Sequence, residues 1–232
     1  MSAASPRYIV AGSRPWNRPL FDQELASLPG RWDFAADSSS LLSLLSEGEA
    51  PRYIFFLHWS VRVPEDMLTQ HECVCFHMTD VPYGRGGSPL QNLIVRGHKE
   101  TKLTALRMIN EMDAGPVYLK QPLSLEGSAE EIYVRAGHLS AQMIKTIIAT
   151  DSTPEPQRGE PVVFKRRTPA QSIVPADLPD VSALHDFIRM LDAEGYPHAF
   201  IEHGGFRFEF VGSALQEGGV TAQVRITPVA RS

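Results

Sequence analysis

Residues 73–94, CVCFHMTDVPYGRGGSPLQNLI, join a short apolar run to a glycine-rich loop and then to an apolar stripe. The apolar run has the length of a buried strand, and His77 lies at its end. Ser88 is followed by a proline, and a Ser-Pro pair is typical of a helix N-cap and the first helical position. The stretch therefore predicts a strand, a loop and a helix, with a titratable imidazole where the strand meets the loop.

Two similar apolar runs precede this stretch, RYIVAG from residue 7 and RYIFFLHWS from residue 52. Between them, SSSLLSLLSE predicts a short capped helix. TKLTALRMI from residue 101 predicts another strand, and SAEE from residue 128 is a capping box that opens a long helix. Strands that are apolar on both faces and alternate with helices are typical of a parallel sheet. We expect an α/β fold, a Rossmann-like and mostly parallel sheet with helices on both faces.

The character of the chain changes at residues 153–161, TPEPQRGEP, whose three prolines suggest a linker. Beyond it, helical spacing of apolar residues predicts a helix over 184–191, and AFIEHGGFRFEF predicts a hairpin around Gly204 and Gly205. We expect a catalytic domain over residues 1–155 and a small α+β C-terminal domain over 156–232. Its β-rich tail is also where we expect a homodimer surface.

Composition indicates a globular chain of ordinary type, 43% hydrophobic and 21% charged. The formal net charge of −5 argues against a nucleic-acid partner, because neutralising phosphates requires clustered Lys and Arg. We see no signal peptide and no apolar run near the roughly 20 residues that span a bilayer, so we expect no membrane association. With only two cysteines, a reducing cytoplasm is the expected location.

Four potential metal ligands alternate along one short segment: His71, Cys73, Cys75 and His77. In a straight strand they would spread over roughly 20 Å, whereas zinc ligands converge to within about 2.3 Å of one ion. We therefore expect no metal site. The loop GRGGSP lacks the GK[ST] of a phosphate-binding loop, so it reads either as a close approach to a ligand or as a tight surface loop.

Asp113 follows a predicted strand at the turn DAGP. In a parallel sheet, ligand sites form beyond the carboxyl ends of the strands, so His77 and Asp113 could meet at one edge. A carboxylate beside an imidazole fixes its tautomer and stabilises its protonated form, as acid–base chemistry requires. A satisfied core histidine is the alternative.

Taken in order, these residues resemble the folate-dependent formyltransferases. The positions that carry the resemblance are His77, Pro82, Arg85 and Gly86, Pro89, Gly97, Thr101 and Thr104, and the DAGPV that begins at Asp113. The resemblance covers residues 52–150 well and the rest loosely. It implies a methionyl-tRNA formyltransferase-like fold and a formyl group taken from 10-formyltetrahydrofolate. It also implies transfer of that group to an amine by His77, oriented by Asp113.

One position departs from the family pattern. An asparagine that serves as an oxyanion donor usually stands two residues before the histidine, and Cys75 stands there in this chain. A thiol is a weak donor, so His58 and Ser60 are candidates for the missing hydrogen bond, with ordinary loop polar residues as the alternative. The resemblance further implies folate contacts from two segments: Leu57, His58, Trp59, Ser60, Asn110, Glu111 and Met112.

The net charge of −5, the short chain and the lack of a sizeable basic C-terminal domain argue against a tRNA substrate. The compact chain instead resembles the nucleotide-sugar N-formyltransferases, and its segments FHMTDVPYGRGGSPLQNLI, FKRRTP and IRMLDAEGYPHAF are similar to members of nonulosonic-acid or surface-glycan pathways. This resemblance implies a UDP-linked 4-amino-4,6-dideoxy-N-acetyl sugar as the acceptor. The expected substrate contacts are Trp16, Asn17, Thr79, Arg85 and Gly86. Ordinary packing is the alternative for Trp16, and a solvated linker is the alternative for the basic FKRR at 164–167. Three other functions stay open: a methionyl-tRNA formyltransferase-like enzyme, a glycinamide-ribonucleotide formyltransferase and a degenerate, non-catalytic binding module. The nucleotide, the sugar and the aminated carbon are left open.

Overall fold

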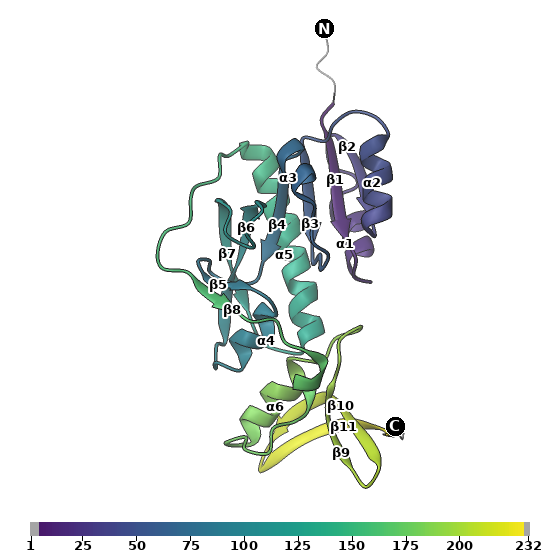
Figure 1. The fold of residues 1–232 in the computed structure, drawn as a ribbon, viewed down its shortest axis with the longest axis vertical. Coiled ribbons are helices and arrows are strands. Elements are labelled where there is room, and N and C mark those ends of the chain that lie inside the picture. The colour runs from purple at the N-terminus through teal and green to yellow at the C-terminus, as the bar shows by residue number, and fades with distance from the viewer. Residues whose placement is uncertain (1–4, 230–232) are drawn as a thin grey trace. The chain divides into compact units, whose positions relative to one another are not determined.

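A computed structural model describes residues 5–229 (Figure 1). Its helices and strands, in chain order, are β1 Arg7–Gly12, α1 Asn17–Glu24, β2 Arg31–Ala35, α2 Ser38–Ser46, β3 Tyr53–Leu57, α3 Glu65–Gln70, β4 Cys73–His77, β5 Tyr83–Gly86, α4 Pro89–Ile94, β6 Glu100–Arg107, β7 Val117–Ser124, α5 Ala129–Thr150, β8 Val162–Phe164, η1 Pro169–Ser172, α6 Val181–Arg189, β9 Ala199–His203, β10 Phe206–Gln216 and β11 Gly219–Pro228. Two compact units emerge from the residue contacts. The first comprises the chain up to Arg85, Lys102–Leu123 and Val134–Val163, and the second comprises the three stretches between and after them.

The principal sheet has six strands in the order β2-β1-β3-β4-β6-β7. β1 is parallel to β2 and to β3, and β3 is parallel to β4, whereas β6 is antiparallel to β4. The three apolar runs that begin at residues 7, 52 and 73 form the adjacent central strands, because a strand with neighbours on both sides and helices on both faces must be apolar throughout. The predicted α/β class and mostly parallel sheet are confirmed, and the antiparallel β6 makes the sheet a mixed one.

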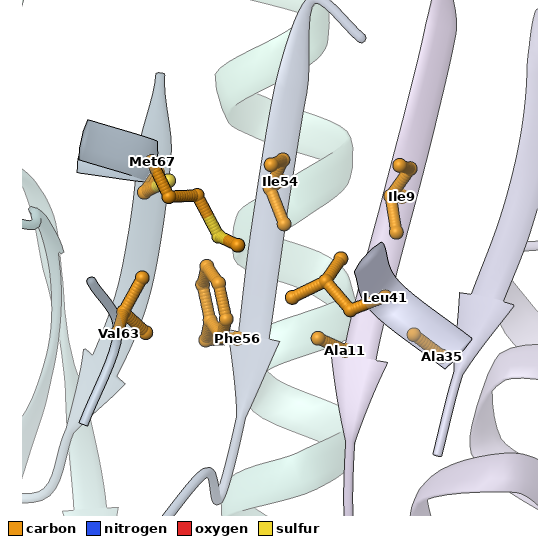
Figure 2. Packing of buried hydrophobic residues seen from close by; sticks show 9 residues of the cluster. Ile9, Ala11, Ala35, Leu41, Ile54, Phe56, Val63 and Met67 are labelled. Atoms are coloured by element: carbon orange, nitrogen blue, oxygen red, sulfur yellow. The ribbon is translucent and has the colours of Figure 1, made fainter. Parts of the chain in front are cut away.

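Helices cover both faces of this sheet. On one face, Leu41 of α2 and Met67 of α3 lie over Ile9, Ile54 and Phe56. On the opposite face, α5 runs behind the same strands (Figure 2). All five side chains are buried. Burial of a side chain of this size stabilises the fold by roughly 1.5–3 kcal/mol, so this cluster fixes β1 and β3 beneath the two helices.

Two strands of the sheet were not predicted. β2 and β7 are the edge strands, and most of their residues are only partly buried, so neither shows the continuous apolar run of a central strand. An ion pair between side chains helps to hold β2 against β1. The Nε atom of Arg7 in β1 lies 2.7 Å from a carboxylate oxygen of Asp33.

The helix starts were predicted with mixed success. Ser128 and Glu131 exchange the two hydrogen bonds of the predicted capping box at the start of α5. The cap of α2 comes from Asp37, one residue before the serines. Ser88 occupies the N-cap position of α4 and Pro89 is the first helical residue, as predicted, but Ser88 has φ of +50° and its side chain makes no cap hydrogen bond. Its hydroxyl accepts a hydrogen bond from the Arg167 backbone N–H at 3.0 Å instead.

The second unit contains the predicted C-terminal helix as α6 and the predicted hairpin as β9 and β10, which β11 extends to a three-stranded sheet. Gly204 and Gly205 have φ of +60° and +80°, the left-handed conformations that a two-residue hairpin turn requires. The predicted domain boundary at residue 155 stays a prediction. Among the described residues, no helix combines the length and the apolar character needed to cross a membrane.

Candidate active site

His77 is the last residue of β4, and the structure fixes which of its nitrogens is available for chemistry. Its Nε2 atom lies 2.8 Å from the carbonyl oxygen of Gly84. A carbonyl oxygen can only accept, so Nε2 carries the proton and donates it to this bond. The hydroxyl of Thr79 donates to the same carbonyl at 3.3 Å. In the neutral imidazole, Nδ1 is therefore the nitrogen with a free electron pair.

Asp113 faces that nitrogen. Its Oδ1 atom lies 3.6 Å from Nδ1 of His77, within range of an ion pair and longer than a hydrogen bond. The two side chains are only 14% and 9% exposed. Little water screens the pair, so the carboxylate would stabilise an imidazolium ion once Nδ1 takes up a proton.

The two residues meet for a different reason from the one the sequence suggested. β6 runs antiparallel to β4, so its end at Arg107 lies opposite Val74, and Thr104 lies opposite His77. The carboxyl ends of these two strands therefore lie at opposite ends of the sheet. Asp113 reaches His77 because residues 108–116 fold back, with the Arg107 N–H donating to the Pro116 carbonyl at 2.9 Å.

This returning turn depends on a glycine and on an unusual backbone conformation. A Cβ atom on Gly115 would lie 1.7 Å from the carbonyl oxygen of Arg107, so no larger residue fits there. Asp113 itself has φ of +54°, in the left-handed region that non-glycine residues rarely adopt. The turn is thus packed directly on the strand that it leaves.

Gln157 is a residue of this site that the sequence did not reveal. It lies in the proline-rich segment predicted to be a linker. Its side-chain N–H groups donate to the carbonyl oxygens of Asp113 and Gly115, both at 2.8 Å. Its amide oxygen accepts from Nε of Arg85 at 3.0 Å, and a terminal nitrogen of Arg85 lies 3.3 Å from the Glu111 carboxylate. No local pattern could identify Gln157, because its partners are more than forty positions away along the chain.

Cys75 has the chemistry of a neutral thiol. Burial raises its pKa well above the ordinary value, and the nearby Asp113 carboxylate adds to this effect. The thiol therefore stays protonated and can only be a weak donor. Burial and the positive charge of Arg14 together lower the pKa of His58 to about 3, so that imidazole is neutral near pH 7. Ser60 is exposed. Which group takes the place of the family asparagine stays a prediction.

The segments predicted to contact folate both lie in the first unit. Leu57 ends β3 and is buried, and the ring of Trp59 meets Phe56 edge-on with centroids 5.6 Å apart. The side chain of Asn110 bonds to Arg62 at 3.0 Å and to Glu65 at 3.2 Å. Met112 is 62% exposed. Their roles toward folate stay predictions.

The residues predicted to contact the acceptor differ widely in exposure. Thr79 and Asn17 are buried, and the Asn17 side-chain oxygen accepts a hydrogen bond from the Arg14 N–H at 2.9 Å. Trp16 is half-buried and lies edge-on to His58, with ring centroids 5.7 Å apart. Gly86 ends β5 with φ of +100°. Within residues 5–229, no group of three or more His, Cys, Asp or Glu side chains is arranged to hold a metal ion.

Comparison with known proteins gives this site its context. The family model described as "Methionyl-tRNA formyltransferase, C-terminal domain" matches residues 169–227. The solved structure of a methionyl-tRNA formyltransferase from Clostridium thermocellum is 39% identical, with a TM-score of 0.90 over 97% of this chain and 100% of that chain.

Two further comparisons give one sequence relative and one protein that shares the fold. Methionyl-tRNA formyltransferase of Microcystis aeruginosa is 26% identical over 171 residues, which are 71% of this chain and 51% of that protein. The chain thus spans about half the length of the curated relatives it matches. A 4-N formyltransferase from Francisella tularensis shares the fold, with a TM-score of 0.66 and 15% identity over 86% of this chain and 93% of that one. The chain belongs to the formyltransferase family that has the methionyl-tRNA formyltransferase fold.

Proposed function

We propose that this protein transfers a formyl group from 10-formyltetrahydrofolate to a primary amine, and that the amine is that of methionyl-tRNA. Formyltransferases of this family use 10-formyltetrahydrofolate as the one-carbon donor. The observation that carries the chemistry is the His77–Asp113 pair, with Nδ1 facing the carboxylate at 3.6 Å. The acceptor is supported by 39% identity to a methionyl-tRNA formyltransferase along nearly the whole chain.

In the proposed reaction, the acceptor nitrogen forms a bond to the formyl carbon, whose oxygen takes up negative charge. When this tetrahedral intermediate collapses, the bond from the carbon to N10 of the folate breaks. His77 takes the proton from the amine at Nδ1 and returns it to N10, so tetrahydrofolate leaves neutral at that position. The Nε2–H bond to the Gly84 carbonyl keeps Nδ1 as the nitrogen that accepts the proton. Asp113 balances the positive charge that the imidazole carries between the two transfers.

The test of this chemistry replaces the two residues separately. His77→Ala removes the base, and Asp113→Asn removes the charge while keeping a residue that tolerates positive φ. Each variant should lower kcat for tetrahydrofolate release by about 10²–10⁴-fold, the usual contribution of a positioned acid or base. Circular dichroism and the melting temperature check that each variant is folded.

His203→Ala is the matched control, since His203 lies at the exposed end of β9. It should turn over like the wild type. Full turnover by His77→Ala or by Asp113→Asn would remove the proposed mechanism.

The acceptor is tested with the exposed basic residues that follow β8. Lys165 and Arg166 are both exposed in the second unit. A phosphate backbone bound there would release counterions, so the reversal Lys165→Glu with Arg166→Glu should lower kcat/KM for methionyl-tRNA. Raising the salt concentration should lower kcat/KM of the wild type more steeply than that of the double variant. With a small acceptor, the double variant and the wild type should react equally.

A nucleotide-linked 4-amino sugar is the second candidate acceptor. The net charge of −5 favours it, as does the fold shared with a 4-N formyltransferase over nearly that protein's whole length. Parallel assays with initiator methionyl-tRNA and with UDP-4-amino-4,6-dideoxy-N-acetyl sugars distinguish the two acceptors. Turnover of the sugar alone would overturn the tRNA proposal, and binding without turnover of either would favour a non-catalytic module. The cytoplasmic location and the homodimer stay predictions.

A further inference from the structure

The segment with the composition of a linker belongs to the first unit and is hydrogen-bonded to β7 beside the site. Glu155 exchanges two backbone hydrogen bonds with Val117 at the start of β7, at 2.7 and 2.9 Å. Two residues later, Gln157 places its side chain against the turn that carries Asp113. Residues 155–157 therefore have a fixed position relative to the catalytic pair.

Both the nitrogen and the oxygen of the Gln157 carboxamide form hydrogen bonds. Its nitrogen donates to the carbonyls of Asp113 and Gly115, and its oxygen accepts from Arg85. The surrounding protein thus offers two carbonyl acceptors and one N–H donor to this side chain. A carboxamide matches that set, and no other common side chain of this length does. A carboxylate could keep the bond from Arg85 but would face two carbonyl oxygens with acceptors only.

The nitrogen and the oxygen of the Gln157 carboxamide contact the two segments that position His77 and Asp113. On the nitrogen side, it fixes the peptide groups around Asp113, whose φ of +54° must be held by its surroundings. On the oxygen side, it holds Arg85, which follows Gly84 directly in β5. The Gly84 carbonyl is the group that binds Nε2 of His77. One side chain thus links the strand that orients the imidazole to the turn that orients the carboxylate.

We propose that Gln157 is a positioning residue that sets the contact between His77 and Asp113 by bonding both segments that carry it. This inference rests on the proposed function, because the contact matters only if the pair is catalytic. Small displacements of reacting groups are costly, about 10²-fold for a shift near 1 Å, so the loss of these bonds should act on turnover. Substrate binding should change less than turnover, since the two amide N–H groups and one lone pair of the oxygen are taken by protein partners, and Arg85, a predicted acceptor contact, keeps its ion pair with Glu111.

The experiment compares two replacements of nearly the same size in the full chain. Gln157→Met removes all three hydrogen bonds, and Gln157→Glu keeps the bond from Arg85 and loses the two to the turn. Both variants should lower kcat by about 10–100-fold, with KM for 10-formyltetrahydrofolate and for the acceptor within about 3-fold of wild type. A Gln157→Glu variant with wild-type kcat would overturn the proposal.

The pH dependence distinguishes positioning from a general loss of structure. When the carboxyl group introduced by Gln157→Glu is protonated, it regains an O–H donor for one turn carbonyl. The charged residues around it are Arg85, whose guanidinium contacts the Gln157 side chain, Glu111, whose carboxylate pairs with Arg85, and Asp113, whose backbone carbonyl accepts from Gln157. The kcat of Gln157→Glu relative to wild type should therefore rise as the pH falls from 8 to about 5.5, toward the usual Glu range. The same ratio for Gln157→Met should stay flat, and equal profiles for both variants would contradict the mechanism.

Arg158→Ala is the matched control. Arg158 is the next residue of the same segment, its side chain is 90% exposed, and its ion pair with Glu155 spans 3.9 Å. It should leave kcat unchanged. A nitrogen-15 NMR spectrum of His77 adds a readout that does not require turnover. Gln157→Met should shift the Nδ1 resonance and Arg158→Ala should not, even if the wild type formylates neither acceptor. An unshifted Nδ1 resonance in Gln157→Met would overturn the inference by itself.

Discussion

At the scale of single residues, His58 shows how the end of a central strand creates an unusual imidazole. The residue follows β3 directly and has φ of +47°, so it turns the chain at the carboxyl edge of the sheet. Burial, with the charge of Arg14, lowers its pKa to about 3 from an ordinary value of 6.5. Between those two values the unfolded chain binds a proton at this position and the folded chain does not. The free energy of unfolding therefore rises with pH across this window and is lost as the pH falls through it.

We predict that His58→Asn flattens this dependence, because asparagine does not titrate and tolerates positive φ. The slope of unfolding free energy against pH between about 4 and 6 should decrease by as much as ~1.4 kcal/mol per pH unit. Urea unfolding at a series of pH values measures it. His203→Asn, on the exposed end of β9, should keep the wild-type slope, and an unchanged slope in His58→Asn would show that His58 titrates normally.

At the scale of elements, the returning turn between β6 and β7 is what places Asp113 beside His77. Its fit to β6 leaves no room for a Cβ atom on Gly115, which would lie 1.7 Å from the Arg107 carbonyl oxygen. We predict that Gly115→Ala pushes the turn away and destabilises the protein by about 3 kcal/mol, at the upper end for overpacking. Turnover should fall along with stability, because Asp113 moves with the turn.

The melting temperature and kcat together check this prediction. Gly219→Ala is the control, because nothing lies within 4 Å of a Cβ atom there. An unchanged melting temperature in Gly115→Ala would mean that the turn does not depend on its contact with Arg107.

At the scale of the whole molecule, the second unit is assembled from stretches far apart in the sequence. The guanidinium of Arg189 donates to the carbonyls of Leu125 and Gly127 at 2.6 and 2.8 Å. The side chain of Gln91 donates to the Met190 carbonyl at 3.0 Å. The C-terminal stretch from Phe164 thus satisfies buried polar groups of the earlier stretches, which would otherwise stay unpaired at a cost of about 1–3 kcal/mol each.

We predict that a chain ending at residue 163 does not unfold cooperatively, whereas the chain of residues 1–232 does. Differential scanning calorimetry measures both. A sharp transition in the shorter chain, at the melting temperature of residues 1–232, would mean that residues 1–163 fold alone and would support the domain boundary predicted near residue 155.

By itself, the sequence determined the formyltransferase family, from positions spread over residues 52–150. It also determined the central strands, the capping box at Ser128 and the glycine hairpin. These features are local, since an apolar run of strand length or a pair of glycines carries its own conformational preference. It also singled out His77 and Asp113, by a resemblance and by an argument from parallel strands that does not apply to β6.

Only the tertiary structure decided how the site is put together. The direction of β6, the edge strands β2 and β7, the hydrogen bonds of Gln157 and the use of Ser88 as an acceptor for Arg167 all depend on partners distant in the chain. Such contacts leave no periodic pattern in the sequence. A hydrogen bond between residues more than forty positions apart constrains one side chain and its geometry, but it does not constrain the types of the neighbouring residues in the sequence.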